Sequence, residues 1–161
     1  YWIIFYKHYY LLQMLINIDP ILSPELLHAL RSMGHGDKLV LADANFPSAS
    51  LAKKLIRLDG ANIPNAAKAI LSVLPLDSFV DYPVERMEID GNPDEINDVH
   101  QDLIDVLKNS AGDKWKVGSI ERFKFYEEAK QAYMIVSTTD ARAFGCFIIT
   151  KGVIKPDGSV W

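Results

Sequence analysis

The sequence has a single cysteine, Cys146, among its 161 residues. A disulfide within the chain is therefore impossible, and a reducing cytoplasm is the simplest compartment to expect. No Cys-x-x-Cys or His-Glu-x-x-His spacing occurs. Because these spacings are typical of zinc sites, we expect no metal site.

The sequence also lacks a large excess of either positive or negative charge. The 17 Lys and Arg and 21 Asp and Glu residues give a formal net charge of −4, and the basic residues form no run. This balance argues against nucleic acid and against an anionic membrane surface as partners. No apolar run approaches the ~20 residues that a membrane-spanning helix needs.

The common catalytic motifs are also missing. The sequence has no Gly-x-Ser-x-Gly elbow, no phosphate-binding loop, no glycine-rich dinucleotide loop and no clear pair of catalytic carboxylates. None of these motifs therefore identifies a site in this sequence.

Residues 1–13, "YWIIFYKHYYLLQ", differ in composition from the rest, and the first methionine is Met14. The segment lacks the basic start and small-residue cleavage site of a signal peptide. We expect residues 1–13 to be an upstream or non-native leader and residues 14–161 to form the functional domain. A genuine extra strand or helix is the alternative.

What the sequence does contain is an alternation of helix and strand patterns, without internal repeats or long linkers. Apolar spacing and turn residues predict helices over residues 23–34, 63–75, 92–112 and 120–132. They predict strands over residues 38–42, 53–60, 83–89, 133–138 and 144–150. This alternation indicates a single-domain α/β fold, with helices layered around a central β-sheet.

The first and third predicted helices carry specific expectations. Ser23 suits the N-cap of the first helix, Pro24 its first position, and Gly34 a left-handed position that ends it. His28 and His100 are expected at the surface. The apolar side of the helix over residues 92–112 is expected to consist of Ile96, Val99, Leu103, Val106 and Leu107.

The stretch "MGHGDKLVLADANFP" places two candidate site residues at the two ends of one predicted strand. His35, between two glycines, could approach a ligand closely, or the glycines could simply make a turn. Asp43 follows the strand at the end where ligands bind in open α/β sheets, or it could cap its own backbone in an Asx turn.

Two further candidates lie four residues apart in "ERFKFYEEA". On a helix, Arg122 and Tyr126 share one face, where a guanidinium and a phenol could hold and protonate a polyhydroxylated ligand. The alternative is a surface helix whose charged side chains form ion pairs. Cys146 lies in an apolar run and is expected to be a small core residue rather than a nucleophile.

Three segments together resemble the L-fucose mutarotase family, a sibling of D-ribose pyranase. They are "ILSPELLHALRSMGHGDKLVLADANFP", "IERFKFYEEAKQAY" and "GCFIITKGV", and the resemblance runs from about Met14 to Val153. It implies the fold of that family and a cofactor-free exchange of α and β anomers of a reducing sugar, through ring opening and proton transfer.

The resemblance also implies residue roles. His35 matches the family's general acid, and Asp43 and Arg122 match ligands of the sugar hydroxyls. Tyr126 resembles a catalytic tyrosine proposed for animal members. The family's Tyr-Gly-Asn motif is Phe144-Gly145-Cys146 here, so this binding segment lacks a phenol and an amide. At about 1 kcal/mol per lost hydrogen bond, the change should affect sugar preference or rate.

Distance along the strand raises one more question about the site. If extended, the eight residues from His35 to Asp43 span ~26 Å, too far for one monosaccharide to touch both. Either the turn at Gly36 folds His35 back, or one site takes residues from two subunits. Members of the L-fucose mutarotase family form ring-shaped homo-oligomers, commonly decamers, so the resemblance implies a homo-oligomer. It also implies a fucose-like substrate. D-ribose pyranase activity, or a non-catalytic sugar-binding or regulatory role on the same fold, are the alternatives.

Overall fold

The computed structural model describes residues 14–161, so the predicted leader lies outside the described residues. The helices are α2 (Pro24–Ser32), α3 (Ser48–Leu51), α4 (Ile63–Leu71), α5 (Asp98–Ala111) and α6 (Arg122–Gln131). The strands are β1 (Lys38–Ala42), β2 (Leu55–Leu58), β3 (Val84–Met87), β4 (Val117–Ile120), β5 (Met134–Thr138) and β6 (Phe147–Thr150). No helix in this part of the chain is long and apolar enough to cross a membrane.

The strands form one mixed sheet in the order β2-β5-β1-β6-β3-β4. β5 pairs in parallel with both β1 and β2, and β3 pairs in parallel with β4. β6 runs antiparallel between β1 and β3 and joins the two parallel groups. The predicted single-domain α/β fold with a central sheet is confirmed.

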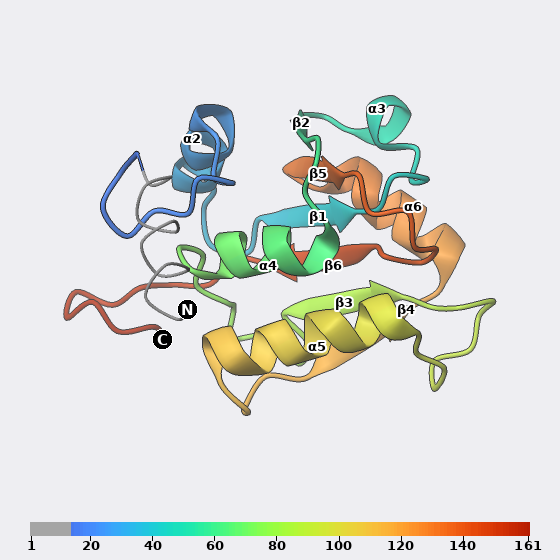
Figure 1. The fold of residues 1–161 in the computed structure, drawn as a ribbon. Helices are drawn as coiled ribbons and strands as arrows, with labels where there is room; N and C mark the ends of the chain where they lie inside the picture. The colour runs from blue at the N-terminus through green and yellow to red at the C-terminus, as the bar shows by residue number, and fades with distance from the viewer. Residues whose placement is uncertain (1–13) are drawn as a thin grey trace, which may run out of the picture.

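Helices cover both faces of this sheet, and the pattern of β1 shows why. Leu39 and Leu41 point into the core beneath α2, α4 and α5, whereas Val40 and Ala42 point into the core beneath α6. Alternate side chains of a strand face opposite sides, so a strand covered on both faces is apolar at successive positions, as residues 39–42 are. Figure 1 shows α4 and α5 crossing in front of the sheet, with α6 behind it.

The start of α2 agrees with the sequence, but its end does not. Ser23 is the N-cap and accepts the N–H of Leu26, and Pro24 occupies the first turn. The chain then leaves the helix at Met33 in an extended conformation, which buries the Met33 side chain. The left-handed glycine is Gly36, with φ of +81°, and not Gly34 as predicted. Gly34 is held differently, because its N–H donates to Asp37 at 2.7 Å.

Helix α5 begins later than predicted. Asn97 caps it by accepting the N–H of His100, and residues 92–97 form turns rather than helix. Ile96 therefore lies outside the helix and is 45% exposed, so its predicted place on the apolar side is wrong. Val99, Leu103 and Leu107 are buried as predicted. The expectation that His100 is a surface residue is also wrong, because its side chain is fully buried, whereas His28 is exposed as predicted.

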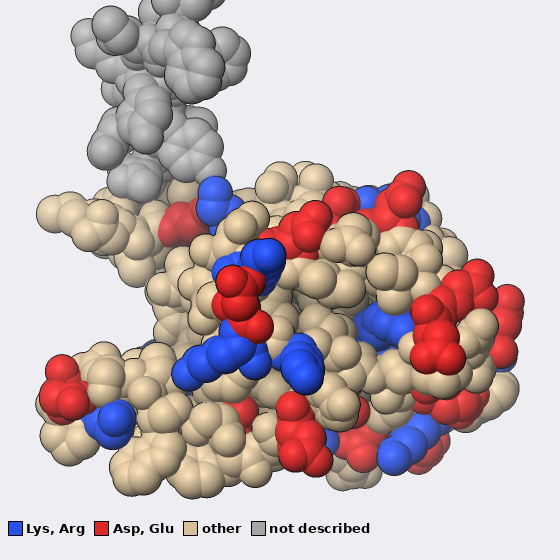
Figure 2. Space-filling view, turned by 90° about the horizontal axis from the view of Figure 1, so that it is seen from below, with Lys and Arg blue, Asp and Glu red and all other residues tan. Residues whose placement is uncertain are grey.

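Charges of both signs lie interspersed on the face of the molecule shown in Figure 2. This agrees with the scarcity of basic runs in the sequence. Among residues 14–161, no group of three or more His, Cys, Asp or Glu side chains is arranged to hold a metal ion.

Candidate functional site

A small hollow of about 140 Å³ lies where β1 ends, beside the first turns of α6. The residues that line it are Asp43, Asn45, Phe46, Met87, Arg122, Tyr126, Ala143, Phe144 and Cys146. Five of the residues predicted for the site therefore surround one hollow, although they come from three separate segments of the chain. Asn45, Phe46, Met87 and Ala143 were not predicted. Asn45 and Phe46 follow directly after Asp43, whereas nothing in the sequence distinguishes Met87 from core.

Asp43 is buried, and both of its carboxylate oxygens accept hydrogen bonds. Oδ1 accepts the N–H groups of Asn45 at 2.9 Å and Phe46 at 3.0 Å, which is the Asx turn considered for this residue. Oδ2 accepts the N–H of Gly145 at 2.9 Å and the thiol of Cys146 at 3.4 Å. Asp43 thus connects the end of β1 to the segment before β6, and it also lines the hollow.

Arg122 and Tyr126 stand on the same side of α6, as their spacing predicts. Glu121 caps the helix by accepting the N–H groups of Phe123 and Lys124. The Tyr126 ring packs against Phe46, with ring centroids 5.5 Å apart. The Arg122 guanidinium lies 4.7 Å from the ring of Phe123.

The alternative of an ion-paired surface helix applies to other side chains of α6. Lys130 pairs with Glu127 at 2.7 Å, and Glu128 pairs with Lys38 of β1 at 2.9 Å. Within residues 14–161, Arg122 makes no salt bridge. Its donors are therefore available at the rim of the hollow to a ligand that carries hydroxyl groups.

The segment Phe144-Gly145-Cys146 precedes strand β6, which begins at Phe147 rather than at Phe144 as predicted. Phe144 has a left-handed backbone, with φ of +61°. Cys146 is buried in the same core cluster as Phe125 and lines the hollow. Burial, with the neighbouring carboxylate of Asp43, raises the pKa of the Cys146 thiol, so a nucleophilic role is disfavoured, as predicted.

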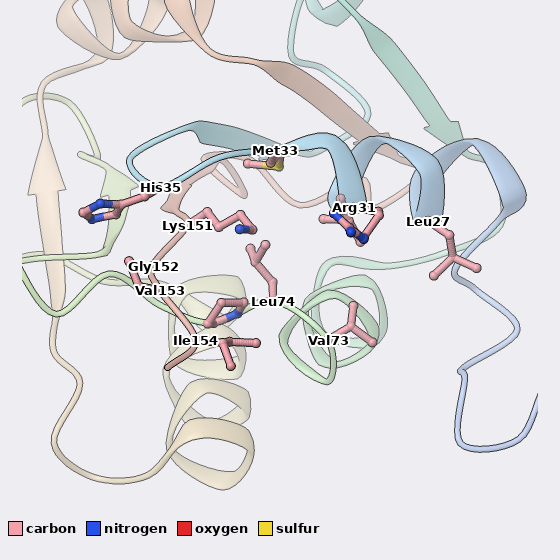
Figure 3. Close-up of a pocket in the computed structure, with 12 residues that line it drawn as sticks. Leu27, Arg31, Met33, His35, Val73, Leu74, Lys151, Gly152, Val153 and Ile154 are labelled. Carbon is pink, nitrogen blue, oxygen red and sulfur yellow. The ribbon is translucent and has the colours of Figure 1, made fainter. Parts of the chain in front are cut away.

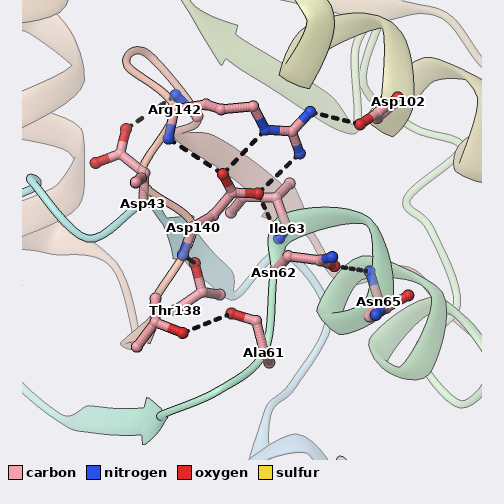
Figure 4. Close-up of polar contacts among 12 residues, drawn as sticks. Asp43, Ala61, Asn62, Ile63, Asn65, Asp102, Thr138, Asp140 and Arg142 are labelled. Atoms are coloured by element: carbon pink, nitrogen blue, oxygen red, sulfur yellow. Dashed lines mark hydrogen bonds and ion pairs between the residues drawn. The ribbon is translucent and has the colours of Figure 1, made fainter.

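Arg142 ties the loop between β5 and β6 to two helices (Figure 4). Its Nε and Nη2 donate to the carboxylate of Asp140 at 3.0 and 2.8 Å, and its Nη1 donates to Asp102 of α5 at 2.6 Å. Asp140 in turn accepts the N–H of Ile63, the first residue of α4, at 3.0 Å. The Arg142 guanidinium lowers the pKa of Asp140 from 3.8 to about 2. The loop that carries Phe144 is therefore firmly anchored.

His35 lies at the opposite end of β1 from this hollow. Its Nε2 is 3.1 Å from Oδ1 of Asp77, a buried carboxylate, and its ring is 5.3 Å from that of Phe79. The His35 side chain remains 47% exposed. An exposed imidazole oriented by a buried carboxylate is suited to proton transfer.

His35 also stands at one end of a larger groove of about 730 Å³, shown in Figure 3. The groove runs along α2 between Leu27 and His35, and residues 151–154 form part of its wall. Its lining is mostly apolar side chains from α2, the segment after α4 and the segment after β6.

The turn at Gly36 does not fold His35 back beside Asp43. The N–H of Gly36 donates to the carbonyl of Lys151, which directs the chain straight into β1. The five residues of β1 lie between His35 and Asp43, and they alone span roughly 16 Å. Of the two arrangements considered from the sequence, the one within a single chain is wrong.

Asp77 is the site-like residue that the sequence did not reveal. It follows Leu76 in "LPLDSF", where an Asx turn is the ordinary interpretation, and it does accept the N–H of Phe79 at 3.0 Å. Its pairing with His35 joins residues 42 positions apart. Only the tertiary fold brings them together.

Comparison with known proteins places this fold and these segments in a family. The sequence model of the RbsD / FucU transport protein family matches residues 16–154. The chain belongs to this family. Both the resemblance seen in the sequence and its extent along the chain are confirmed.

Individual members of the RbsD / FucU family are similar over nearly their whole length. The L-fucose mutarotase of Haemophilus influenzae is 43% identical over 87% of this chain and 97% of its own. The fucose mutarotase of Homo sapiens is 41% identical over 86% of this chain and 93% of its own. The crystal structure of the fucose mutarotase from Streptococcus pneumoniae in complex with L-fucose superimposes with a TM-score of 0.81. It is 41% identical and covers 88% of this chain and 100% of that one.

Proposed function

We propose that this protein is a cofactor-free mutarotase that interconverts the α and β anomers of L-fucose or a similar monosaccharide. The observation that carries the proposal is the similarity to fucose mutarotases over almost the full length of both chains. The similarity extends to a structure that holds L-fucose. The segments that contain His35, Asp43, Arg122 and Tyr126 lie within the matched region.

The reaction needs two proton carriers. One takes the proton from the anomeric hydroxyl while the other delivers a proton to the ring oxygen. The ring opens to the aldehyde, the aldehyde rotates, and closure occurs on the other face with the two carriers exchanging roles. His35 suits one role because an imidazole nitrogen can both donate and accept a proton. Tyr126 is the second carrier in this proposal, as its phenol can donate and accept.

The remaining residues would hold the sugar. Arg122 offers N–H donors to hydroxyl groups, and Asp43 is the proposed acceptor. The carboxylate of Asp43 already accepts hydrogen bonds from groups of the chain, so a sugar hydroxyl would replace the weakest of these donors, the Cys146 thiol. The rings of Phe144 and Phe46, with Met87, give the hollow an apolar wall that suits the carbon face of a pyranose.

A complete site in this proposal needs two copies of the chain, because His35 and the hollow lie at opposite ends of β1. An exposed aromatic patch beside His35 supports a second copy at this place. Phe79 is 60% exposed, Trp161 is 55% exposed, and their ring centroids are 5.8 Å apart. Exposed apolar patches next to functional groups commonly mark interfaces. We therefore propose a homo-oligomer, with the decamer that the family resemblance implies as its expected form. The single cysteine favours the cytoplasm as its compartment.

Two other functions compete with this one. A protein that binds the sugar without catalysis is favoured by Phe144 and Cys146, which lack the phenol and amide of the family motif. A D-ribose pyranase is less well supported, because "ADANFP" and "ERFKFYE" resemble the fucose branch.

Saturation-transfer NMR on equilibrium mixtures of anomers separates these functions directly. The mutarotase proposal predicts exchange of L-fucose anomers well above the uncatalysed rate at catalytic protein concentrations, in the absence of metals. Faster exchange for D-ribose than for L-fucose would favour the pyranase. Binding of fucose, ribose or galactose with exchange at the uncatalysed rate for all three would overturn the enzyme assignment in favour of the binding protein.

A further inference from the structure

One peptide group beside the hollow is held at both ends by buried side chains from distant parts of the chain. The carbonyl of Phe144 lies 2.8 Å from Nε2 of His100, on α5. The N–H of Gly145, in the same peptide group, donates to Asp43 at 2.9 Å. His100 is fully buried and Asp43 is 3% exposed, so neither contact competes with bulk water.

The geometry fixes the state of the His100 ring. A carbonyl oxygen can only accept, so Nε2 must carry the hydrogen. Nδ1 is buried and has no hydrogen-bond partner among residues 14–161. The ring packs edge-to-face on Phe147, with centroids 5.8 Å apart. Burial is the main cause that lowers the pKa of His100; the hydrogen bond to the Phe144 carbonyl acts in the opposite direction, and the nearby Arg86 guanidinium adds to the lowering. The imidazole is therefore neutral, with its hydrogen on Nε2.

The held peptide lies where the backbone is both unusual and crowded. Phe144 has a positive φ, which a phenylalanine adopts only when its surroundings impose it. A Cβ at Gly145 would lie 3.2 Å from the Arg142 carbonyl and 3.3 Å from both Asp43 and Val99. Gly145 thus lets the segment approach β1 and α5 closely.

The first turn of α5 holds the preceding peptide as well. Nδ2 of Asn97 donates to the carbonyl of Ala143 at 2.9 Å. The carbonyls of residues 143 and 144 are thus both directed into α5. The ring of Phe144 is left on the side of the hollow, where it and Cys146 form part of the wall.

We propose that His100 is a positioning residue for the sugar site, acting through the Phe144–Gly145 peptide that its Nε2–H and the Asp43 carboxylate hold between them. This role rests on the proposed function, because the wall it positions is that of the proposed sugar site. His100 itself does not line the hollow. Its loss should therefore weaken sugar binding more than it slows proton transfer by His35 and Tyr126.

Two substitutions separate the hydrogen bond from the bulk of the ring. His100→Gln keeps an N–H donor at nearly the position of Nε2, whereas His100→Leu fills the space without one. We expect KM for anomer exchange to rise about tenfold in His100→Leu and about twofold in His100→Gln, with kcat changed less than KM in both. Leu107→Ala, a core truncation further along α5, is the control and should lower the melting temperature without raising KM.

Two results would contradict a positioning role for His100. A folded His100→Leu protein with the KM of the wild type would overturn it, and so would equal KM increases in the Gln and Leu variants. Protection of the Gly145 amide from hydrogen exchange gives a readout that needs no activity. It should fall in His100→Leu and persist in His100→Gln, even if the wild type proves not to catalyse exchange.

The wild-type protein provides a test that does not depend on the folding of any variant. Long-range ¹H–¹⁵N spectra of the imidazoles should show His100 as the neutral ring with hydrogen on Nε2 at neutral pH. A ring protonated on both nitrogens, or one with its hydrogen on Nδ1, would contradict the proposed contact.

Discussion

Asp43 accepts two hydrogen bonds at each carboxylate oxygen, so replacing it by asparagine is a sharp test of how the hollow is built. In Asp43→Asn, the amide oxygen can keep the Asx turn with Asn45 and Phe46, because asparagine also forms such turns. The amide nitrogen then replaces Oδ2. It faces the N–H of Gly145 and the thiol of Cys146, which are both donors.

The expected loss of stability follows from these two contacts. A hydrogen bond to a charged acceptor contributes about 1.5–3 kcal/mol, and a buried N–H left without an acceptor costs about 1–3 kcal/mol. The Gly145 N–H is buried and has no other acceptor among the described residues. We therefore expect Asp43→Asn to lower the free energy of unfolding by about 3 kcal/mol.

Urea unfolding without sugar measures this loss, and Asp37→Asn is the matched control. Within the described part of the chain, the Asp37 carboxylate accepts one backbone N–H, that of Gly34, at an exposed turn. We expect the control to lose less than about 1 kcal/mol. Equal losses in the two variants, or an Asp43→Asn protein as stable as the wild type, would refute the reasoning that Oδ2 anchors the segment before β6.

Three further results are expected. His35→Ala should abolish anomer exchange in the NMR assay while the sedimentation coefficient of the oligomer stays unchanged; retained exchange would contradict its assigned role. The pKa of Asp140 is about 2 in the folded protein and 3.8 in the unfolded chain. Asp140 should therefore contribute about 2 kcal/mol to the free energy of unfolding above pH 3.8, and this contribution should be lost as the pH falls towards 2. Urea unfolding of Asp140→Asn across this range should therefore depend less on pH than that of the wild type. Because the folded pKa of His100 lies below 6.5, its protonation favours unfolding as pH falls below 6.5, so urea titrations should show a smaller acid loss in His100→Gln.

Local patterns in the sequence predicted the elements whose determinants are themselves local. Ser23 and Pro24 mark the start of α2 with groups that act within one helical turn. The run "KLVLA" predicted β1 because its last four residues are all apolar, as is typical of a strand covered on both faces. These features need no knowledge of distant residues.

The failures involve partners far away in the chain. His100 was assigned to the surface because it is polar, although its spacing from Leu103 and Leu107 places it on the buried side of α5. The group that allows its burial, the carbonyl of Phe144, lies 44 positions later. Asp77 pairs with His35 across 42 positions, and no motif joins them. The end of α2 was misplaced because burial of Met33 favours an extended exit over a left-handed glycine.

In the candidate site, too, the sequence predicted what depends on local patterns and missed what depends on distant parts of the chain. The sequence selected seven residues, and the fold places five of them around one hollow: Asp43, Arg122, Tyr126, Phe144 and Cys146. Gly145, also selected, does not line the hollow and contacts it only through Asp43, to which its N–H donates. Spacing alone could not say whether His35 belongs with them in one chain. The conformation of Gly36 and the straight course of β1 decide that it does not.

Complementation between inactive subunits tests the shared site most directly. His35→Ala and Arg122→Ala, carrying different affinity tags, would be co-expressed and the mixed oligomers isolated through both tags. If His35 of one copy completes the hollow of another, each variant alone is inactive, and about a quarter of the sites in randomly mixed oligomers have both residues intact. The account predicts that anomer exchange returns in these oligomers to about that fraction of the wild-type rate. Mixed oligomers that form but show no exchange would contradict it.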